Sequence, residues 1–363
     1  MPAPLDPSRP GSDPVPLGRR LIGLARRLSA ALAVALATAA CTPLVIPAGP
    51  AVRPPMVAQD ALLMPDGARL PLHAWAPREG GPPRAVILAL HGFNDYSVNF
   101  MGESARLFTP HGIAVYAYDQ RGFGAAPHPG IWPGEATLAA DATTAARLIR
   151  ARHPGVPLIM LGESMGAAVI VLAATGADPP PADGYILSAP ALWGRIGMNG
   201  AMRWGLWLAS RTIPIVGFQA GVGGISPTDN SAAMRRWMTD PLTLKVTRVD
   251  AAHGLVDLMD AAVARLSACC RGAGHAGPVP TLVLFGKRDR IVPVRVARHV
   301  LAGVPPPAES GTRIAFYEEG WHLLLRDENR QEVVADILAW LADPRAPLPS
   351  GADQAGRAWV EEP

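Results

Sequence analysis

The sequence predicts an α/β fold, a doubly wound and mostly parallel sheet with an inserted helical cap. Three observations predict it: short apolar runs that each end at a glycine or a polar turn, helical spacing between those runs, and one long stretch without a buried strand. The runs cover residues 84–90, 113–118, 157–161, 185–188, 281–285 and 312–317.

The runs are continuously apolar and do not alternate with polar residues, as 84–90 (RAVILAL) and 113–118 (IAVYAY) illustrate. Such runs are typical of parallel strands that are buried on both faces. Helical spacing occurs between runs, for example at 136–151 and 333–341, and strands that alternate with helices build a doubly wound sheet. Functional residues of such sheets lie at the carboxyl ends of the strands, so we expect the chemistry there.

Residues 193–277 interrupt this alternation and predict a mostly helical cap over the sheet. Methionine and tryptophan recur in it, at Met198, Met202, Trp204, Trp207, Met234, Trp237 and Met238. An insertion this apolar must bury its face, and a pocket for an acyl chain is one candidate. We therefore expect Trp193, Trp204 and Trp207 to contact substrate, with packing in the core as the competing interpretation.

The composition excludes some partners. The chain has 363 residues, of which 49% are hydrophobic and 17% charged, which is enough to bury a large core. Residues 1–40 contain five arginines and two aspartates, and this excess accounts for the whole net charge of +3. Nothing in the charge pattern therefore favours a nucleic-acid partner.

The first 40 residues have the pattern of an export signal. Arginines, the last of them Arg26 and Arg27, precede the apolar stretch 28–40, which is shorter than the roughly 18 residues that a membrane span needs. Small residues then lead to Cys41, and this order resembles a bacterial lipoprotein signal in which Cys41 is lipidated. Ordinary signal-peptidase cleavage and an uncleaved anchor remain open. We expect an exported protein of the cell envelope, held at the outer membrane or in the periplasm, with secretion as the alternative.

The remaining domain boundaries follow composition. Residues 41–56 are Pro-rich and predict a tether, 57–343 form the α/β domain with its cap, and the Pro/Gly/Ala-rich segment 344–363 predicts a loose tail. Cys269 and Cys270 are adjacent and have no third partner once Cys41 is set aside. We expect them to be small packed side chains, not part of a disulfide framework or a metal site.

The segment 162–166 (GESMG) carries the strongest chemical signal. It follows the apolar run 157–161 and opens the helical run 167–173, which is the context of a nucleophile elbow. A serine hydroxyl needs an adjacent base and donors for the oxyanion. This context predicts Ser164 as an attacking nucleophile.

The base and the orienting acid should follow Ser164 at other strand ends. His322 stands directly after the last predicted strand, and Asp289 follows the run 281–285. The rival acids are Asp119 and Asp141, which precede Ser164, and Asp257, Asp260 and Glu318, which lack the strand-end turn. We predict His322 as the base and Asp289 as the acid that orients it. His91 follows another strand, where it is expected to shape the turn.

Two backbone N–H groups should form the oxyanion hole. Met165 follows the nucleophile, and Phe93 lies in the loop after the run 84–90. The side chains of Phe93 and Asn94 are also candidates for the acyl pocket. The Gly122–Gly124 motif is followed by Pro127 where a dinucleotide fingerprint requires glycine, so no cofactor is implied, and no metal motif is present.

These motifs together resemble the monoacylglycerol lipase and lysophospholipase-like branch of the α/β-hydrolases, of the serine aminopeptidase S33 type. The resemblance covers about 60–341 and includes segments 91–93 (HGF), 119–124 (DQRGFG), 162–166 (GESMG), 286–289 (GKRD) and 320–322 (GWH). Segment 94–96 (NDY) departs from the family pattern and puts head-group recognition in doubt. The resemblance implies a cap that admits one acyl chain.

The predicted activity is hydrolysis of carboxylic esters of lipid-like substrates, monoacylglycerols or lysophospholipids, through an acyl-enzyme on Ser164. The same triad serves thioesterases, peptidases and haloperoxidase-like enzymes. A catalytically silent lipid-binding lipoprotein is the alternative from another class.

Overall fold

The computed structural model describes residues 26, 28–29, 42–219, 226–270 and 277–362. The chain divides into two compact units, Met1–Thr42 and Pro43–Pro363. In the first unit, residues 26, 28 and 29 are helical. No helix in the described part of the chain is long and apolar enough to span a membrane. The signal segment and Cys41 lie almost entirely outside the described residues, so their predicted roles remain predictions.

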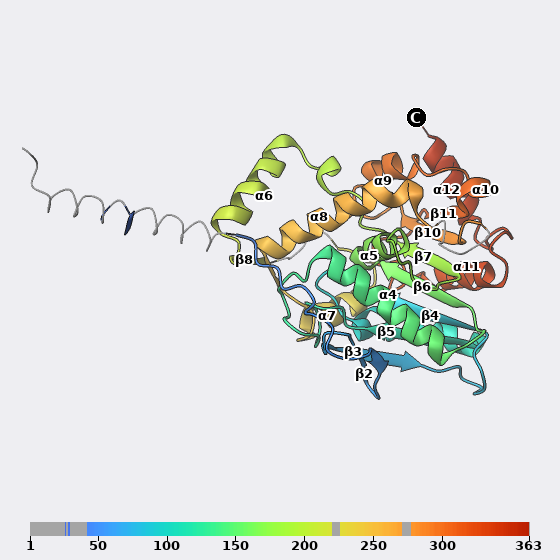
Figure 1. Ribbon diagram of the computed structural model, residues 1–363. Helices are drawn as coiled ribbons and strands as arrows, with labels where there is room; N and C mark the ends of the chain where they lie inside the picture. The colour runs from blue at the N-terminus through green and yellow to red at the C-terminus, as the bar shows by residue number, and fades with distance from the viewer. Residues whose placement is uncertain (1–25, 27, 30–41, 220–225, 271–276, 363) are drawn as a thin grey trace, which may run out of the picture. The chain divides into compact units, whose positions relative to one another are not determined.

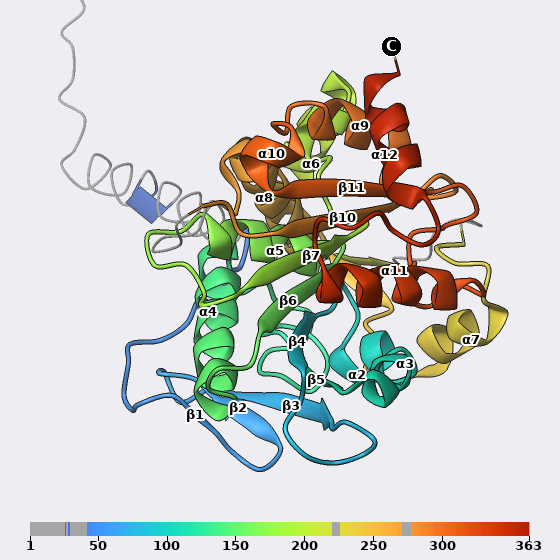
Figure 2. The same cartoon turned by 90° about the vertical axis from the view of Figure 1, so that its right-hand side faces the viewer.

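The second unit is built on a nine-stranded sheet with the order β1-β2-β3-β5-β4-β6-β7-β10-β11 (Figures 1 and 2). The first three strands pair antiparallel, and all pairs from β5 to β11 are parallel. The strands are β1 Met56–Val57, β2 Ala61–Leu63, β3 Arg69–Trp75, β4 Ala85–Leu90, β5 Ile113–Tyr118, β6 Leu158–Glu163, β7 Gly184–Ser188, β10 Thr281–Gly286 and β11 Thr312–Tyr317. The predicted fold class and all six predicted strands are confirmed, with bounds that shift by at most two residues.

Helices cover both faces of the sheet (Figure 2). Strand β4 shows why its sequence is continuously apolar: Val86, Leu88 and Leu90 enter one hydrophobic core, while Ala85, Ile87 and Ala89 enter the other. The first core contains residues of α4 Glu135–Arg152, α5 Met165–Ala174, α8 Val249–Arg265 and α9 Val294–Leu301, and the second contains residues of α2 Ser97–Met101, α3 Ala105–Phe108 and α11 Arg330–Ala342. All residues of α5 are buried, because this helix packs between the sheet and the helices α4 and α8.

The cap lies between β7 and β10 in the chain. It contains helices α6 Gly200–Thr212 and α7 Ser231–Thr239, the two-stranded sheet of β8 Gly217–Gln219 and β9 Val246–Arg248, and α8. Helix α6 packs on α8, which in turn packs on α5. The prediction of a mostly helical insertion is therefore confirmed for its described residues. Short 3-10 turns occur at Arg195–Gly197 and Leu266–Ala268, and another, Thr109–His111, precedes β5.

The predicted loose tail is wrong for most of its length. Residues Ala352–Glu361 form α12, and α10 Pro307–Ser310 precedes β11. Trp359 of α12 stacks on Phe316 of β11, with ring centroids 4.4 Å apart, and also on Phe285 of β10. Two aromatic rings on the sheet provide the apolar surface that orders the segment, and this surface is not visible in the composition of the tail itself.

The predicted tether is attached to the domain from Leu44 onward. The Leu44 N–H donates to Asp250 of α8, the Ile46 N–H to the Trp132 carbonyl, and the Ala48 N–H to the Thr137 hydroxyl. The N–H groups of this segment thus find acceptors on both the α/β core and the cap. The described residues of this segment are therefore bound to the domain and do not form a free tether.

Cys269 and Cys270 are buried, as predicted. They are joined by a disulfide, however, which the sequence analysis did not expect. The pairing joins adjacent residues, a case outside the spacing patterns from which disulfide frameworks are predicted.

Candidate active site

Ser164 occupies a strained turn between β6 and α5. Its backbone has a positive φ of 53° with ψ −111°, a conformation that residues other than glycine rarely adopt. The flanking glycines are required by close contacts. A Cβ atom added to Gly162 would lie 2.5 Å from the Ala167 nitrogen, and one added to Gly166 would lie 2.1 Å from the Leu90 oxygen. The chain thus has the backbone geometry of a nucleophile elbow.

Asp289 and His322 meet at the same edge of the sheet. The His322 Nδ1–H donates to Asp289 Oδ2 over 2.8 Å, and both side chains are buried. The other oxygen, Asp289 Oδ1, accepts from the N–H groups of Ile291 and Val292 at 2.7 and 2.9 Å. These donors hold the carboxylate in place, so it can fix the tautomer and orientation of the imidazole.

The charge environment of His322 favours its protonated form. Burial alone would lower its pKa, but the Asp289 carboxylate overcomes this effect and leaves the pKa raised. Glu163, the residue before Ser164, raises it further. A base with a raised pKa accepts a proton more readily once it is neutral.

Ser164 and His322 lie at the carboxyl ends of strands β6 and β11, with β7 and β10 between them. Within the described chain, the Ser164 hydroxyl makes no hydrogen bond to His322. Catalytic hydrogen bonds of ligand-free enzymes are often long and shorten when substrate binds. The structure thus places the three predicted catalytic residues at one edge of the sheet and joins two of them directly.

The loop after β4 lies against the nucleophile. A Cβ added to Gly92 would be 3.5 Å from the Ser164 Cβ, an ordinary van der Waals distance, so the backbone of the loop lies directly beside the nucleophile. Phe93 is the next residue of this loop. Met165 is the first residue of α5, where the backbone N–H has no acceptor within the helix. The predicted donor Met165 is therefore next to Ser164 in the chain, and the predicted donor Phe93 belongs to the loop that lies beside Ser164 in space.

His91 has a structural environment. Its Nδ1 donates to the Gly92 carbonyl at 2.8 Å, and its Nε2 accepts from the Gln120 N–H at 3.0 Å. Burial lowers its pKa, so the ring is neutral. With both ring nitrogens engaged, His91 shapes the turn, in agreement with the sequence analysis.

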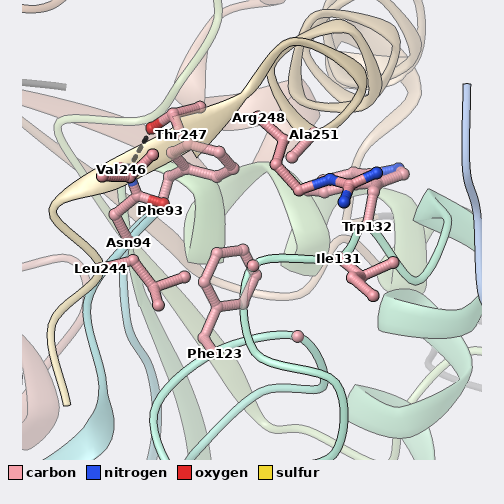
Figure 3. A pocket seen from close by; sticks show the side chains of 12 residues that line it. Phe93, Asn94, Phe123, Ile131, Trp132, Leu244, Val246, Thr247, Arg248 and Ala251 are labelled. Atoms are coloured by element: carbon pink, nitrogen blue, oxygen red, sulfur yellow. Dashed lines mark hydrogen bonds between the residues drawn. The ribbon is translucent and has the colours of Figure 1, made fainter. Parts of the chain in front are cut away.

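A small apolar pocket lies beside the loop that carries Phe93 (Figure 3). The space in it that a water molecule can enter is about 10 Å³, and the Asn94 amide forms one wall by donating to the Thr247 hydroxyl over 2.6 Å. The side chains that line it come from the α/β core and the cap: Phe93, Asn94, Phe123, Ile131, Trp132, Leu244, Val246, Thr247, Arg248 and Ala251. The cap strand β9 and the residues before it were not predicted as part of the site, because their sequence has no chemical motif.

The three tryptophans predicted to bind substrate do not line this pocket. Trp204 and Trp207 project from α6 with 62% and 49% of their surface exposed. Trp193 is partly buried against the hydrophobic core and lies beside Gly197. Of the residues predicted to bind substrate, the structure brings Phe93 and Asn94 together in one pocket.

Arg326 is a buried residue of the site that the sequence analysis missed. It pairs with Asp95 of the loop after β4 and with Glu163 of the elbow. A charged residue directly after the apolar segment 323–325 (LLL) was the signal that could have indicated it. Within the described residues, no group of three or more His, Cys, Asp or Glu side chains is arranged to hold a metal ion.

The sequence pattern of one protein family, described as Serine aminopeptidase, S33, matches residues 81–329, more than half of the chain. The chain belongs to this family. This S33 hydrolase is 25% identical over 279 residues to a monoacylglycerol lipase of Mycolicibacterium smegmatis, with 76% of this chain and 93% of the relative covered. It is also 25% identical over 296 residues to the monoglyceride lipase of Homo sapiens, with 76% and 88% covered.

Solved structures agree on the fold of the S33 hydrolase. A monoacylglycerol lipase of Paleococcus ferrophilus has a TM-score of 0.57 at 21% identity, covering 75% of this chain and 98% of that one. A soluble variant of the monoglyceride lipase of Saccharomyces cerevisiae has a TM-score of 0.63 at 18% identity, covering 83% and 97%. The family resemblance is thus confirmed, and the S33 hydrolase is a carboxylic ester hydrolase with the α/β-hydrolase fold.

Proposed function

We propose that this hydrolase cleaves the acyl ester of a monoacylglycerol or a lysophospholipid through a triad of Ser164, His322 and Asp289. The observation that carries the proposal is the buried His322–Asp289 hydrogen bond at the sheet edge where the elbow presents Ser164. The hydroxyl of Ser164 attacks the ester carbonyl while His322 Nε2 takes its proton. The N–H groups of Phe93 and Met165 stabilise the oxyanion, and Asp289 stabilises the imidazolium.

The same groups complete the reaction. His322 gives its proton to the leaving alcohol as the tetrahedral intermediate collapses to an acyl-serine. Water then attacks this ester with His322 again as the base, and the fatty acid leaves with Ser164 restored. Every proton taken from Ser164 or water is returned, so no cofactor is needed.

Two observations support a lipid substrate. The relatives from Mycolicibacterium smegmatis and Homo sapiens are named as a monoacylglycerol lipase and a monoglyceride lipase, and the pocket beside Phe93 is mostly apolar. The space in it that a water molecule can enter is only about 10 Å³, far below the range of roughly 300–1,000 Å³ that is usual for ligand pockets. A lipid must therefore displace cap side chains or use the pocket for only part of its chain.

We also propose that the protein is exported and attached to the cell envelope through a lipid on Cys41. The arginines, the apolar stretch 28–40 and the small residues before Cys41 support this proposal. Metabolic labelling with an alkyne fatty acid tests it: labelling that is lost in Cys41→Ser supports the proposal. Equal labelling of the variant, or none in either protein, contradicts it.

The triad is tested with Ser164→Ala and, as a matched control, Ser231→Ala, which changes an exposed serine of α7. Hydrolysis of a p-nitrophenyl ester should fall by about 10⁴- to 10⁶-fold in the first variant and stay unchanged in the second. A fluorophosphonate should label Ser164, as located by peptide mapping. Retained activity in Ser164→Ala, or a label on another serine, would contradict the proposal.

The substrate is tested on the wild-type enzyme with monoacylglycerols, lysophospholipids and aminoacyl amides of matched size. The largest kcat/KM should be found among the two lipid classes. If an aminoacyl amide is the best substrate, the lipid assignment is wrong although the triad stands.

A further inference from the structure

Arg326 lies four residues after His322 with only 4% of its side chain exposed. Its Nη1 donates to Asp95 Oδ2 over 2.6 Å, and its Nη2 donates to Glu163 Oε1. Its guanidinium also faces the ring of Phe100 at 5.8 Å. One buried cation thus joins three separate segments of the chain.

Each of these segments carries a group of the proposed mechanism. Glu163 ends β6 and directly precedes Ser164, and Asp95 stands two residues after Phe93 in the loop that approaches Ser164. Arg326 itself belongs to the segment that begins with His322. The ion pairs therefore link the nucleophile, an oxyanion donor and the base across the sheet edge.

The segments have further ties of their own. Asp95 Oδ1 accepts from the Tyr96 N–H and the Asn99 side chain at 2.9 and 2.7 Å. The Arg326 carbonyl accepts from the Asn230 side chain at 2.9 Å, which connects this segment to the cap. Arg326 is thus fixed at its backbone, and its partner Asp95 is fixed in turn.

Stability alone does not account for this arrangement. Removing a charge from water costs several kcal/mol, and apolar side chains of similar volume often stabilise a core equally well or better. The cluster is also not fully satisfied, because Arg326 Nε and Glu163 Oε2 have no hydrogen-bond partner among the described residues. A bidentate fork is, however, well suited to hold two carboxylates at a defined separation.

We propose that Arg326 is a positioning residue: its guanidinium fixes the His322 segment, the Ser164 elbow and the Phe93 loop at the separation that acyl transfer requires. The proposal rests on the proposed function, since it assigns Arg326 to the same reaction. A displacement of about 1 Å between reacting groups can cost about 100-fold in rate.

The cluster also acts on the protonation of His322. The charged groups that face His322 are Asp289, Glu163 and Arg326; the first two raise its pKa and Arg326 lowers it. Around Arg326 lie Asp95, Glu163 and the neutral His91, and His91 also faces Asp119. Asp327, the next residue, has its pKa raised to about 7, chiefly by burial, and accepts from the Trp321 N–H and the Thr228 hydroxyl.

The first test separates geometry from charge with Arg326→Lys. Lysine keeps the charge but not the fork, so kcat for a soluble p-nitrophenyl ester should fall by about 10- to 100-fold. KM and the acidic limb of the pH profile should change little. Wild-type kcat in a folded Arg326→Lys protein would overturn the proposal, because a single point charge would then be enough.

The second test changes the charge with Glu163→Gln, which keeps the shape of the side chain. The carboxylate that raises the pKa of His322 is removed while Arg326 remains, so the acidic limb of kcat/KM should move to lower pH. A residue with a purely structural role would change stability without moving this limb. An unmoved limb in the folded variant would contradict the electrostatic part of the proposal.

Arg326→Met leaves two buried carboxylates without their cation and can prevent folding. The triple variant Asp95→Asn, Glu163→Gln, Arg326→Met removes all the charges together and keeps the volume. It should fold and label with fluorophosphonate at Ser164 about 10- to 100-fold more slowly than the wild type. Wild-type labelling of the triple variant overturns the positioning role, whereas absence of Ser164 labelling in the wild type itself overturns the proposed function.

Discussion

The sheet edge and the cap of this hydrolase are built in opposite ways. At the sheet edge, glycines 162 and 166 have no room for a Cβ atom, and Asp289 and His322 are buried in a direct hydrogen bond. On the cap, α6 exposes Trp204 and Trp207, and β8 exposes Phe218. The reacting groups are thus held by close backbone contacts and a buried hydrogen bond, while these apolar side chains of the cap are open to solvent.

Hydrogen bonds between described residues join the two regions near the site, among them those that Asn230 and Thr228 of the cap donate to Arg326 and Asp327. Asn94 and its carbonyl pair with Thr247 and the Leu244 N–H, and the Tyr96 hydroxyl donates to Asp240 over 2.6 Å. Because of this difference, substitutions at the sheet edge should lower the catalytic rate. Substitutions on the exposed face of the cap should change little except the binding of substrate. The following predictions test this contrast in order of expected effect.

The largest effect is expected for Asp289→Asn. The amide cannot stabilise the imidazolium and favours the wrong tautomer of His322, so kcat should fall by about 10⁴-fold. Ester hydrolysis at saturating substrate measures it. The control is Glu318→Gln, a rival acid on the surface that pairs with Lys287 and should retain full activity. A larger loss in the control would move the orienting role to Glu318.

Trp359→Ala should produce the largest loss of stability away from the reacting groups. The ring is nearly buried between α12 and the sheet, where it stacks on Phe285 and Phe316. Truncation of a buried tryptophan costs about 3–5 kcal/mol, measurable as the free energy of unfolding in urea. Trp359→Phe keeps a stacked ring and should lose less. An unchanged midpoint in Trp359→Ala would show that the tail is loose after all.

Asp250→Asn should have an intermediate effect. The buried carboxylate accepts from the Leu44 N–H, the Ala251 N–H and the Arg248 guanidinium. The substitution weakens the ion pair with Arg248 and should cost about 1–3 kcal/mol. Limited proteolysis should also cut the segment after Leu44 faster than in the wild type. Cleavage at the wild-type rate would mean that other contacts hold the segment.

Trp204→Ser and Trp207→Ser should have the smallest effects. Surface substitutions usually change stability by less than about 0.5 kcal/mol, and neither side chain lines the pocket. The turnover of a short soluble ester should therefore be unchanged, as measured by initial rates. A drop comparable to that of Asp289→Asn would show that α6 belongs to the catalytic region.

Much of the sheet was predictable because burial on both faces leaves a signal in the sequence. Strands β5 and β11 have the predicted bounds, and the strand-end order of Ser164, Asp289 and His322 indicated where they would meet. The strain at Ser164 and the glycine contacts agree with the elbow predicted from segment 162–166. The motif around Ser164 and the positions of the apolar runs therefore indicated the same catalytic residues.

The rest depended on contacts between distant segments. The ordering of α12 requires rings on β10 and β11, and the cluster around Arg326 requires two carboxylates that lie 231 and 163 residues away in the chain. No periodicity encodes such contacts. For the tryptophans of α6, the sequence predicted a contact with substrate, but neither side chain lines the pocket. Apolar residues at helical spacing predict a buried helix face but do not show which part of the molecule covers it.

The hydrogen bond from Leu44 to Asp250 has a consequence for how the cap is restrained. Leu44 precedes the first strand of the sheet, whereas Asp250 lies 206 residues later in the cap helix α8. The next N–H groups of the same segment donate to the Trp132 carbonyl and to Thr137 of α4. The segment before the sheet therefore acts as a strap that joins the cap helix to the α/β core, far in sequence from both ends of the insertion.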